Sequence, residues 1–300
     1  MKDINEIINS CAEYIDNVCK LNRTIYEKHI WDDEALLFRG QSNKDYELIP
    51  SLGRGRNFAC DCTIFNEERN LIEMAKYRMP DIFHKDLLPI ELLSLLQHHG
   101  IPTRLLDVTQ NALVALYFAC VGNENNDGEI IVFKETTIDV TNYPVVNAIA
   151  DTYRFAHGTW TPLDSFYEAV IKQPYFAEQI SVLALAHKDK EIGGRWIMNC
   201  CKEIMYIHAP IRSMRQQLQQ GRYILFPNYI NEEEERFEKR LSAIPKSHND
   251  IVARYIIPKE KKEIFLKDLS LLGISKDFLF SDNIDSVCEG VLNKFKRKYY

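Results

Sequence analysis

Apolar residues recur at helical spacing near the start of the chain. Over residues 3–20 they return every three or four positions, so one stripe of a helix would face a core. We expect this helix to form an N-terminal extension over residues 1–25. A second mixture of apolar and charged residues predicts a helix over 63–78, which would end before Pro80 because the residue preceding a proline disfavours helical geometry.

Short apolar runs bounded by turn residues predict the strands. The first, residues 35–38, is followed by Arg39 and Gly40, so a buried strand would carry the arginine to its end before the chain turns. Four further runs of this kind are residues 128–133, 204–207, 223–226 and 251–257.

Two other apolar runs, over residues 92–96 and 109–120, predict helices between these strands. Helices and strands in this order predict an α+β fold, in which peripheral helices surround a mixed, mainly antiparallel sheet. We expect one domain over residues 26–300. The irregular pattern at about 135–200 leaves room for an inserted subdomain.

Composition narrows the class of protein. The 300 residues are 46% hydrophobic and 27% charged, which is enough for a globular core. No stretch approaches the roughly 20 apolar residues of a membrane span, and the eight cysteines lack the spacing of a disulfide framework. We therefore expect a reduced, cytoplasmic protein without membrane contact. The formal net charge of -6 argues against general nucleic-acid binding, although a local patch of Arg212, Arg215 and Arg222 would admit RNA or DNA.

The densest polar stretch, Gln97–Asp107, lies between the apolar runs 92–96 and 109–120 and would connect two helices. Its His98–His99 pair has three interpretations: metal ligands, acid–base groups near neutral pH, or structural caps and core donors. A metal would need a further donor from elsewhere in the chain, and we predict none. Arg104 and Asp107 are three residues apart, so they would pair on a helical turn.

Two other polar groups are candidates for ligand binding. Arg39 offers parallel donors that suit a phosphate or a carboxylate, with a structural ion pair as the alternative, and Gln41 would share its strand face. Ahead of a later predicted strand stand Gln216, Gln217, Gln219 and Gln220. Their neutral amides cannot act as general bases, but they would orient a ribose hydroxyl because they both donate and accept. The alternative for them is a solvated turn.

Three segments together resemble the FRG domain family. They are the tripeptide Phe38-Arg39-Gly40 with Gln41, residues 96–107 with the apolar run 111–119, and residues 212–221 ahead of Phe226. The resemblance covers about residues 30–290. Val108 stands where the family usually has an aromatic residue, and the third segment is expanded, so its register is open.

The family's pattern is in turn similar to the three-part signature of the ADP-ribosyltransferase fold, which implies that fold with NAD as the substrate. Arg39 would hold an NAD phosphate or ribose, and Thr103 would support the nicotinamide ribose. Gln219 or Gln220 would replace the usual glutamate, so Asp107 or another acid would have to supply the charge. The implied catalytic residues are Arg39, Thr103 and Gln220, and the implied NAD-binding residues are Arg39, Gln41, His98, His99, Arg104, Asp107 and Gln219.

The resemblance leaves more than one function open. The first is an NAD-dependent ADP-ribosyltransferase that modifies RNA, DNA or protein, as a toxin-like effector of bacterial or phage defence that needs a neutralising antitoxin. The second is a non-catalytic module that binds a nucleotide, a nucleic-acid end or a partner protein, and the absent glutamate favours it. A third is a metal-dependent hydrolase that uses His98, His99 and Asp107.

Overall fold

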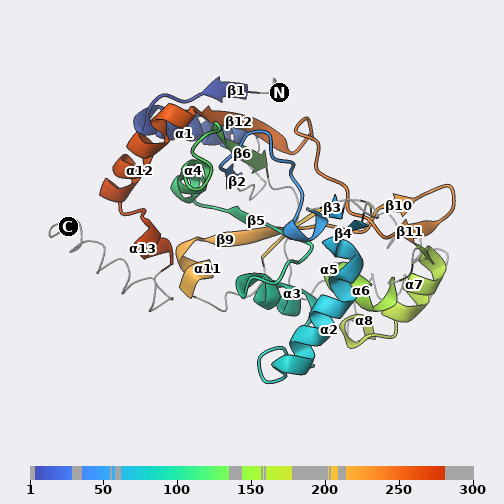
Figure 1. Ribbon diagram of the computed structural model, residues 1–300. Helices are drawn as coiled ribbons and strands as arrows, with labels where there is room; N and C mark the ends of the chain where they lie inside the picture. Colours follow the sequence, from blue (N-terminus) through green and yellow to red (C-terminus); the bar gives the residue numbers. More distant parts are fainter. Residues whose placement is uncertain are drawn as a thin grey trace.

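A mixed sheet runs through the molecule and carries most of its strands (Figure 1). The computed structural model describes residues 4–28, 36–54, 56–57, 62–134, 144–156, 158, 160–177, 202, 204–208 and 214–280. Within these residues the main sheet has seven strands in the order β1-β12-β6-β2-β5-β9-β8. β1 runs parallel to β12, and the other neighbours are antiparallel. The predicted α+β class with a mainly antiparallel sheet is confirmed.

The elements follow each other closely along the described parts of the chain. The main-sheet strands are β1 (Ile4–Ile7), β2 (Leu36–Gln41), β5 (Leu105–Thr109), β6 (Gly128–Lys134), β8 (Met205–Ile207), β9 (Gly221–Leu225) and β12 (Ile251–Ile257). Smaller sheets contain β3 (Arg56–Asn57), β4 (Cys62–Thr63), β7 (Trp160–Pro162), β10 (Ile230–Asn231) and β11 (Arg236–Glu238).

Helices lie around these sheets. They are α1 (Cys11–Lys28), α2 (Glu68–Arg78), α3 (Pro89–His98), α4 (Ala112–Cys120), α5 (Pro144–Ala150), α6 (Thr152–Phe155), α7 (Leu163–Val170), α8 (Pro174–Ala177), α11 (Met214–Leu218), α12 (Lys262–Leu271) and α13 (Lys276–Leu279). Short 3-10 turns occupy Ser51–Gly53, Ile64–Glu67 and Lys259–Lys261. Within the described residues, no helix is both long and apolar enough to cross a membrane.

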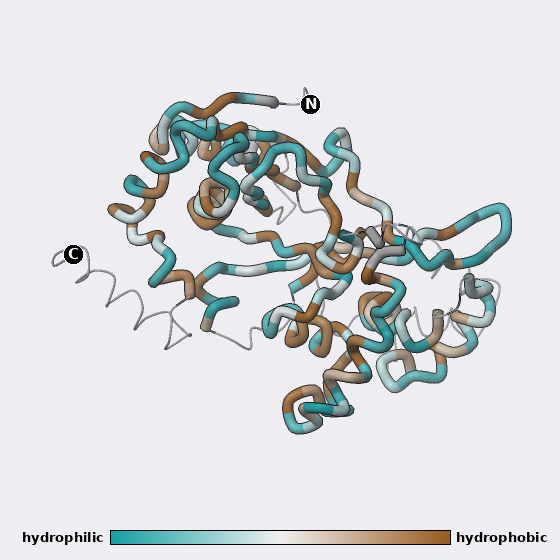
Figure 2. The backbone as a smooth tube through the Cα atoms, in the orientation of Figure 1, coloured by the Kyte–Doolittle hydropathy of each residue, from teal (hydrophilic) through white to brown (hydrophobic). Residues whose placement is uncertain are grey.

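Three apolar clusters form the core. One joins β2, β6 and β12 to α1, α4 and α12, and a second joins β5, β8 and β9 to α3 and α5. The third takes alternate residues of the same strands, such as Leu37 and Leu106, and packs them against Leu48 and Ile244. Figure 2 shows hydrophobic residues along α3, α4 and the central strands, and a hydrophilic loop between β10 and β11. The sheet is therefore buried by different helices along its width, with α4 packed against β2 and α3 against β5.

Two glycines let α4 lie directly on the sheet. A Cβ atom at Gly40 would sit 1.8 Å from the carbonyl oxygen of Ala115, and one at Gly128 would sit 2.1 Å from that of Ala119. Real side chains cannot approach backbone this closely, so both positions require glycine. The glycine of the Phe38-Arg39-Gly40 tripeptide is therefore a packing residue.

The predicted helix over residues 3–20 is wrong in its first part. Ile4–Ile7 forms β1, which pairs with Ala253–Ile256 of β12, and the helix begins only at Cys11. An edge strand gains backbone hydrogen bonds from a partner far along the chain, and local spacing carries no sign of that partner. The predicted domain boundaries stay predictions, and residues 135–143, 157, 159 and 178–200 of the predicted insertion lie outside the described residues.

The predicted connection between two helices is also wrong. Leu105–Thr109 is a strand, so Gln97–Asp107 links helix α3 to strand β5. Helix α4 starts later, at Ala112, where the Asn111 side chain accepts hydrogen bonds from two backbone N–H groups and caps the helix. The runs predicted as strands at 128–133 and 251–257 are confirmed as β6 and β12.

Candidate functional site

A cavity of about 270 Å³ opens where β2 and β5 separate. β2 pairs with β6 over all six of its residues, whereas its described pairing with β5 is Phe38 opposite Thr109. The lining comes from β2, α3, β5, α4 and the segment from α11 into β9. The cavity thus brings together parts of all three segments that the sequence singled out.

Arg39 is the central cation of this cavity. Its Nη1 donates a hydrogen bond to the backbone carbonyl of Asp107 at 2.5 Å. Its Nε is shielded from solvent and has no hydrogen-bond partner among the described residues. Burial lowers the pKa of Arg39 to about 10, the Asp107 carboxylate opposes that shift, and nearby Arg54 adds to it. The guanidinium therefore stays charged at neutral pH, and the described residues leave its Nε donor without a partner.

Two more arginines line the same cavity. The Nε of Arg222 is also buried without a partner in the described part of the chain, while its Nη1 donates to the carbonyl of Gly221 at 3.2 Å. The guanidinium of Arg215 lies 4.6 Å from the ring centroid of Phe280. Together with Arg39 they place three arginines in the described lining, against one carboxylate, that of Asp107. The cavity therefore favours an anionic ligand.

Asp107 is held in place by α3. The side-chain Nε2 of Gln97 donates to its Oδ2 at 2.9 Å. Alternation along β5 points Leu106 and Val108 into an apolar cluster, whereas Asp107 lies exposed between them. The carboxylate thus faces away from that core and lines the cavity.

The remaining wall is apolar and aromatic. Phe38, Val114 and Phe118 line it from β2 and α4, and Tyr223 lines it from β9. Gln216 donates to the Tyr223 hydroxyl at 2.8 Å, and burial raises the pKa of that hydroxyl. Apolar and cationic side chains in one cavity are the composition of a site for a ligand with a ring and an anionic group.

The structure brings Arg39, Asp107 and Gln219 of the predicted site together in this cavity. The carbonyl of Gln219 accepts a hydrogen bond from the Thr109 hydroxyl at 2.6 Å, and its side-chain amide donates to the Leu279 carbonyl at 3.3 Å. Gln220 is exposed, has a φ of 46° and does not line the cavity. Gln219 is thus the better placed of the two candidate glutamines.

Other predicted residues lie away from the lining. Gln41 is buried and donates to the Glu129 carboxylate at 2.9 Å. His99 lies edge-on to Phe83 and to His98, with ring centroids 6.0 and 5.0 Å apart. Thr103 is buried and donates a hydrogen bond to the Gln97 side chain. The structure shows these side chains bonded to or packed against protein groups.

The predicted pair between Arg104 and Asp107 is wrong. Residues three apart on a strand point to opposite faces, and Arg104 points into the core. It donates to the carboxylate of Glu68 at 2.8 and 2.5 Å and to the side-chain oxygen of Asn228 at 2.9 Å. Arg104 is fully buried, so it holds the start of β5 rather than lining the cavity.

Comparison with known families identifies the segment that carries the first two motifs. Residues 34–128 match the FRG domain family. This segment is an FRG domain, and it covers about a third of the chain. No curated protein and no solved structure matches the chain. Arg39 and Asp107 belong to the matched FRG segment, whereas Arg215, Gln219 and Arg222 lie beyond it. The FRG segment therefore supplies only part of the cavity wall, and the α11–β9 segment completes it.

Thr109 is a lining residue of the FRG domain that the sequence did not predict. It lies two residues past Asp107, and on a strand that spacing puts both side chains on one face. A prediction of β5 as a strand would therefore have placed Thr109 beside Asp107. Arg215 and Arg222, predicted as a basic patch beside the site, line the cavity. Arg212, the third member of that patch, lies outside the described residues.

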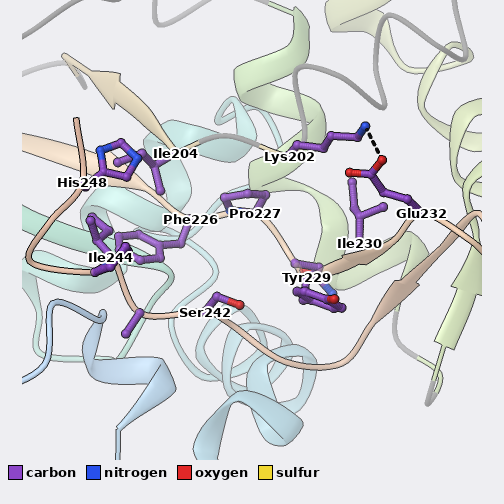
Figure 3. Close-up of a pocket in the computed structure, with 13 residues that line it drawn as sticks. Lys202, Ile204, Phe226, Pro227, Tyr229, Ile230, Glu232, Ser242, Ile244 and His248 are labelled. Atoms are coloured by element: carbon purple, nitrogen blue, oxygen red, sulfur yellow. Dashed lines mark ion pairs between the residues drawn. The ribbon is translucent and has the colours of Figure 1, made fainter. Parts of the chain in front are cut away.

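A second cavity of about 350 Å³ lies at the other end of β9. Figure 3 shows Phe226 and Ile244 on one side of this cavity, and Ile230 on the other side next to the ion pair between Lys202 and Glu232. That ion pair is 3.1 Å long, so the lysine is already neutralised. The buried donors that lack a described partner do not line this cavity. The cavity between β2 and β5 is therefore the better candidate for an anionic ligand.

The described residues contain no candidate metal site. No group of three or more histidine, cysteine, aspartate or glutamate side chains is arranged there to hold an ion. His98, His99 and Asp107, the ligands of the hydrolase hypothesis, do not form such a group. The polar side chains that line the cavity are its arginines, its amides, Asp107, Thr109 and Tyr223.

Proposed function

We propose that the chain binds NAD in the cavity between β2 and β5 and transfers ADP-ribose from it to a macromolecule, either nucleic acid or protein. The observation that carries this proposal is the pairing, in one cavity, of Arg39, which keeps a buried donor without a described partner, with the carboxylate of Asp107. The proposal includes an ADP-ribosyltransferase-like fold, which the meeting of the three sequence motifs at this cavity supports.

The arginines suit the pyrophosphate of NAD. Arg39 and Arg222 both line the cavity, and guanidinium groups bind phosphate oxygens through charge-assisted hydrogen bonds. Phe118 and Val114 offer an apolar surface to a planar ring. The cavity volume is near the lower end of ligand pockets, roughly 300 Å³, so it would enclose one nucleotide half of NAD while the other half lies over the rim.

In the proposed reaction the bond between the nicotinamide nitrogen and the anomeric carbon breaks. Nicotinamide leaves with the bonding electron pair, and a positive charge develops on the ribose carbon and ring oxygen. Asp107 would stabilise that charge, and so take the part of the glutamate missing from the third motif. Gln219 would orient a ribose hydroxyl. A nucleophile of the acceptor then attacks the anomeric carbon, and its proton passes to Asp107 or to water.

The decisive experiment measures nicotinamide release and label transfer from NAD labelled in its adenylate half. The wild-type chain should release nicotinamide and label a macromolecule, and Arg39→Ala and Asp107→Asn should each abolish both signals. Arg240→Ala is the matched control, because this arginine stacks on Tyr229 away from the cavity. Release and transfer that survive both cavity substitutions would remove this site from the proposal.

The second candidate is a nucleotide-binding module without catalysis. The neutral amides of Gln216 and Gln219 at the cavity favour it, because they cannot stabilise a developing positive charge as a carboxylate does. Calorimetry that detects NAD binding, combined with NAD that stays intact through a long incubation, would select this candidate. A chain that binds no nucleotide would contradict both candidates.

We also propose that transfer onto a cellular macromolecule makes the chain a toxin-like effector of bacterial or phage defence, with an antitoxin protein that blocks the cavity. The resemblance to the ADP-ribosyltransferase signature is its support. Induced expression should slow growth, and Asp107→Asn should relieve the effect at equal protein level. Growth inhibition that Asp107→Asn leaves unchanged would contradict a toxicity that depends on this cavity.

A further inference from the structure

A chain of hydrogen bonds links the buried Thr103 to the cavity. The Thr103 hydroxyl donates to Oε1 of Gln97 at 2.8 Å, and Nε2 of Gln97 donates to Oδ2 of Asp107 at 2.9 Å. The same Nε2 lies 3.4 Å from the carbonyl of Leu105. This series of hydrogen bonds runs from the loop after α3, through Gln97 of α3, to β5.

The direction of these hydrogen bonds follows from what each group can donate or accept. The backbone N–H of Leu105 donates to the Thr103 hydroxyl oxygen at 3.2 Å, so the hydroxyl accepts there and turns its own proton to Gln97. Thr103 is only 1% exposed, so water does not compete for either bond. The Gln97 oxygen can only accept and its amino group can only donate. The acceptor-only Asp107 carboxylate and Leu105 carbonyl therefore require the amino group of Gln97 at their end, and the Thr103 hydroxyl holds the amide oxygen at the other end.

An inverted amide would be unfavourable at its Asp107 end. Its oxygen would face the Asp107 carboxylate, and two acceptors would repel each other. A carboxylate bonded to an N–H donor is held in one orientation, and small errors in the placement of a charged group are costly in catalysis. The amide orientation therefore bears on where the Asp107 carboxylate points.

We infer that Thr103 and Gln97 are positioning residues, which aim the Asp107 carboxylate at the anomeric carbon of the bound dinucleotide. The identity of the reaction in this inference rests on the proposed function. The relay of hydrogen bonds from Thr103 through Gln97 to Asp107 does not depend on that function. It also gives Thr103, the second-motif residue, a role without contact to NAD: Thr103 acts through Gln97, and Asp107 is the catalytic residue.

The kinetic test compares Thr103→Val with Thr103→Ser. Valine has nearly the shape of threonine but no hydroxyl, so kcat for nicotinamide release should fall about tenfold, the loss expected for one hydrogen bond of about 1.4 kcal/mol, with KM unchanged. Serine keeps the hydroxyl and should restore kcat. Thr152→Val is the matched control, because Thr152 is equally buried but lies in α6 and bonds to backbone carbonyls of α5. An unchanged kcat in Thr103→Val would overturn the inference.

A structural readout separates this inference from the proposed function. The side-chain amide protons of Gln97, followed by NMR, should shift in Thr103→Val and in Asp107→Ala and keep their positions in Thr103→Ser and Thr152→Val. If the wild-type chain does not cleave NAD, the proposed function fails, and these shifts still test the relay. If the Gln97 amide proton shifts stay unchanged in both Thr103→Val and Asp107→Ala, the relay is overturned, whether or not the protein cleaves NAD.

Discussion

Arg104 donates two hydrogen bonds to the carboxylate of Glu68, at 2.8 and 2.5 Å, with both side chains out of reach of solvent or nearly so. A third bond ties the same guanidinium to Asn228. The pair joins the start of α2 to the start of β5 and to the chain after β9. It therefore fixes the end of the strand that carries Asp107.

We expect Glu68→Gln to lower the free energy of unfolding by about 3–5 kcal/mol, because removing one partner leaves a buried charge uncompensated. Urea denaturation measures this. Glu263→Gln is the control, since its partner Lys267 and Glu263 itself are both largely exposed and such pairs contribute about 0–1 kcal/mol. The double change Glu68→Leu with Arg104→Met should recover much of the loss. Equal effects of Glu68→Gln and Glu263→Gln would contradict the importance of burial.

Gly40→Ala should destabilise the chain by about 3 kcal/mol or more, because the new methyl group meets the Ala115 backbone and overpacking of a rigid contact is costly. Thermal unfolding followed by circular dichroism measures the effect. Gly221→Ala is the matched control, because the nearest atom to its Cβ lies 3.7 Å away, at ordinary contact distance. If Gly40→Ala melts at the wild-type temperature, α4 does not lie as close to β2 as the structure places it.

Asp151 predicts a specific pH dependence of stability. It is 1% exposed, and burial raises its pKa from 3.8 to about 6, despite a 2.9 Å ion pair with Arg154 and a hydrogen bond from Tyr175. Because the folded pKa exceeds the unfolded one, the protonated form favours folding. This contribution is complete below about pH 4 and is lost as the pH rises through about 6.

The loss should amount to about 3 kcal/mol, from roughly two pKa units at 1.36 kcal/mol each. Chemical denaturation of the wild type and of Asp151→Asn, from pH 4 to pH 7, measures it as a difference between two curves. Asparagine does not titrate, so its curve should lack the decline that the wild type shows in this window. Parallel curves would mean that Asp151 keeps its ordinary pKa.

The sequence predicted the strand of Arg39 because a short apolar run meets a glycine there, and it predicted the motifs that meet at the cavity. It failed at β5, which has apolar clusters on both of its faces. A strand buried on both faces loses the alternation that distinguishes it from a helix. That error hid the common face of Asp107 and Thr109. It also produced the wrong pair between Arg104 and Asp107, which a strand places on opposite faces.

The arginines of the cavity should control binding of the anionic part of a nucleotide. Arg39→Ala and Arg222→Ala should each weaken ADP-ribose binding about 10- to 100-fold, because a hydrogen bond to a charged group contributes about 1.5–3 kcal/mol. Calorimetry measures both, with Arg240→Ala as the control. Binding of nicotinamide alone, which has no phosphate, should change little in any of the three variants.

Added salt provides a separate check on the same arginines. Charge attraction weakens as ionic strength rises, so salt should reduce ADP-ribose affinity in the wild type and reduce it less in Arg39→Ala. A wild-type affinity that salt does not change would mean that the Arg39 and Arg222 guanidinium groups do not meet the phosphates. The cavity would then have to select its ligand through the apolar wall formed by Phe118 and Val114, since that wall offers no charge for salt to screen.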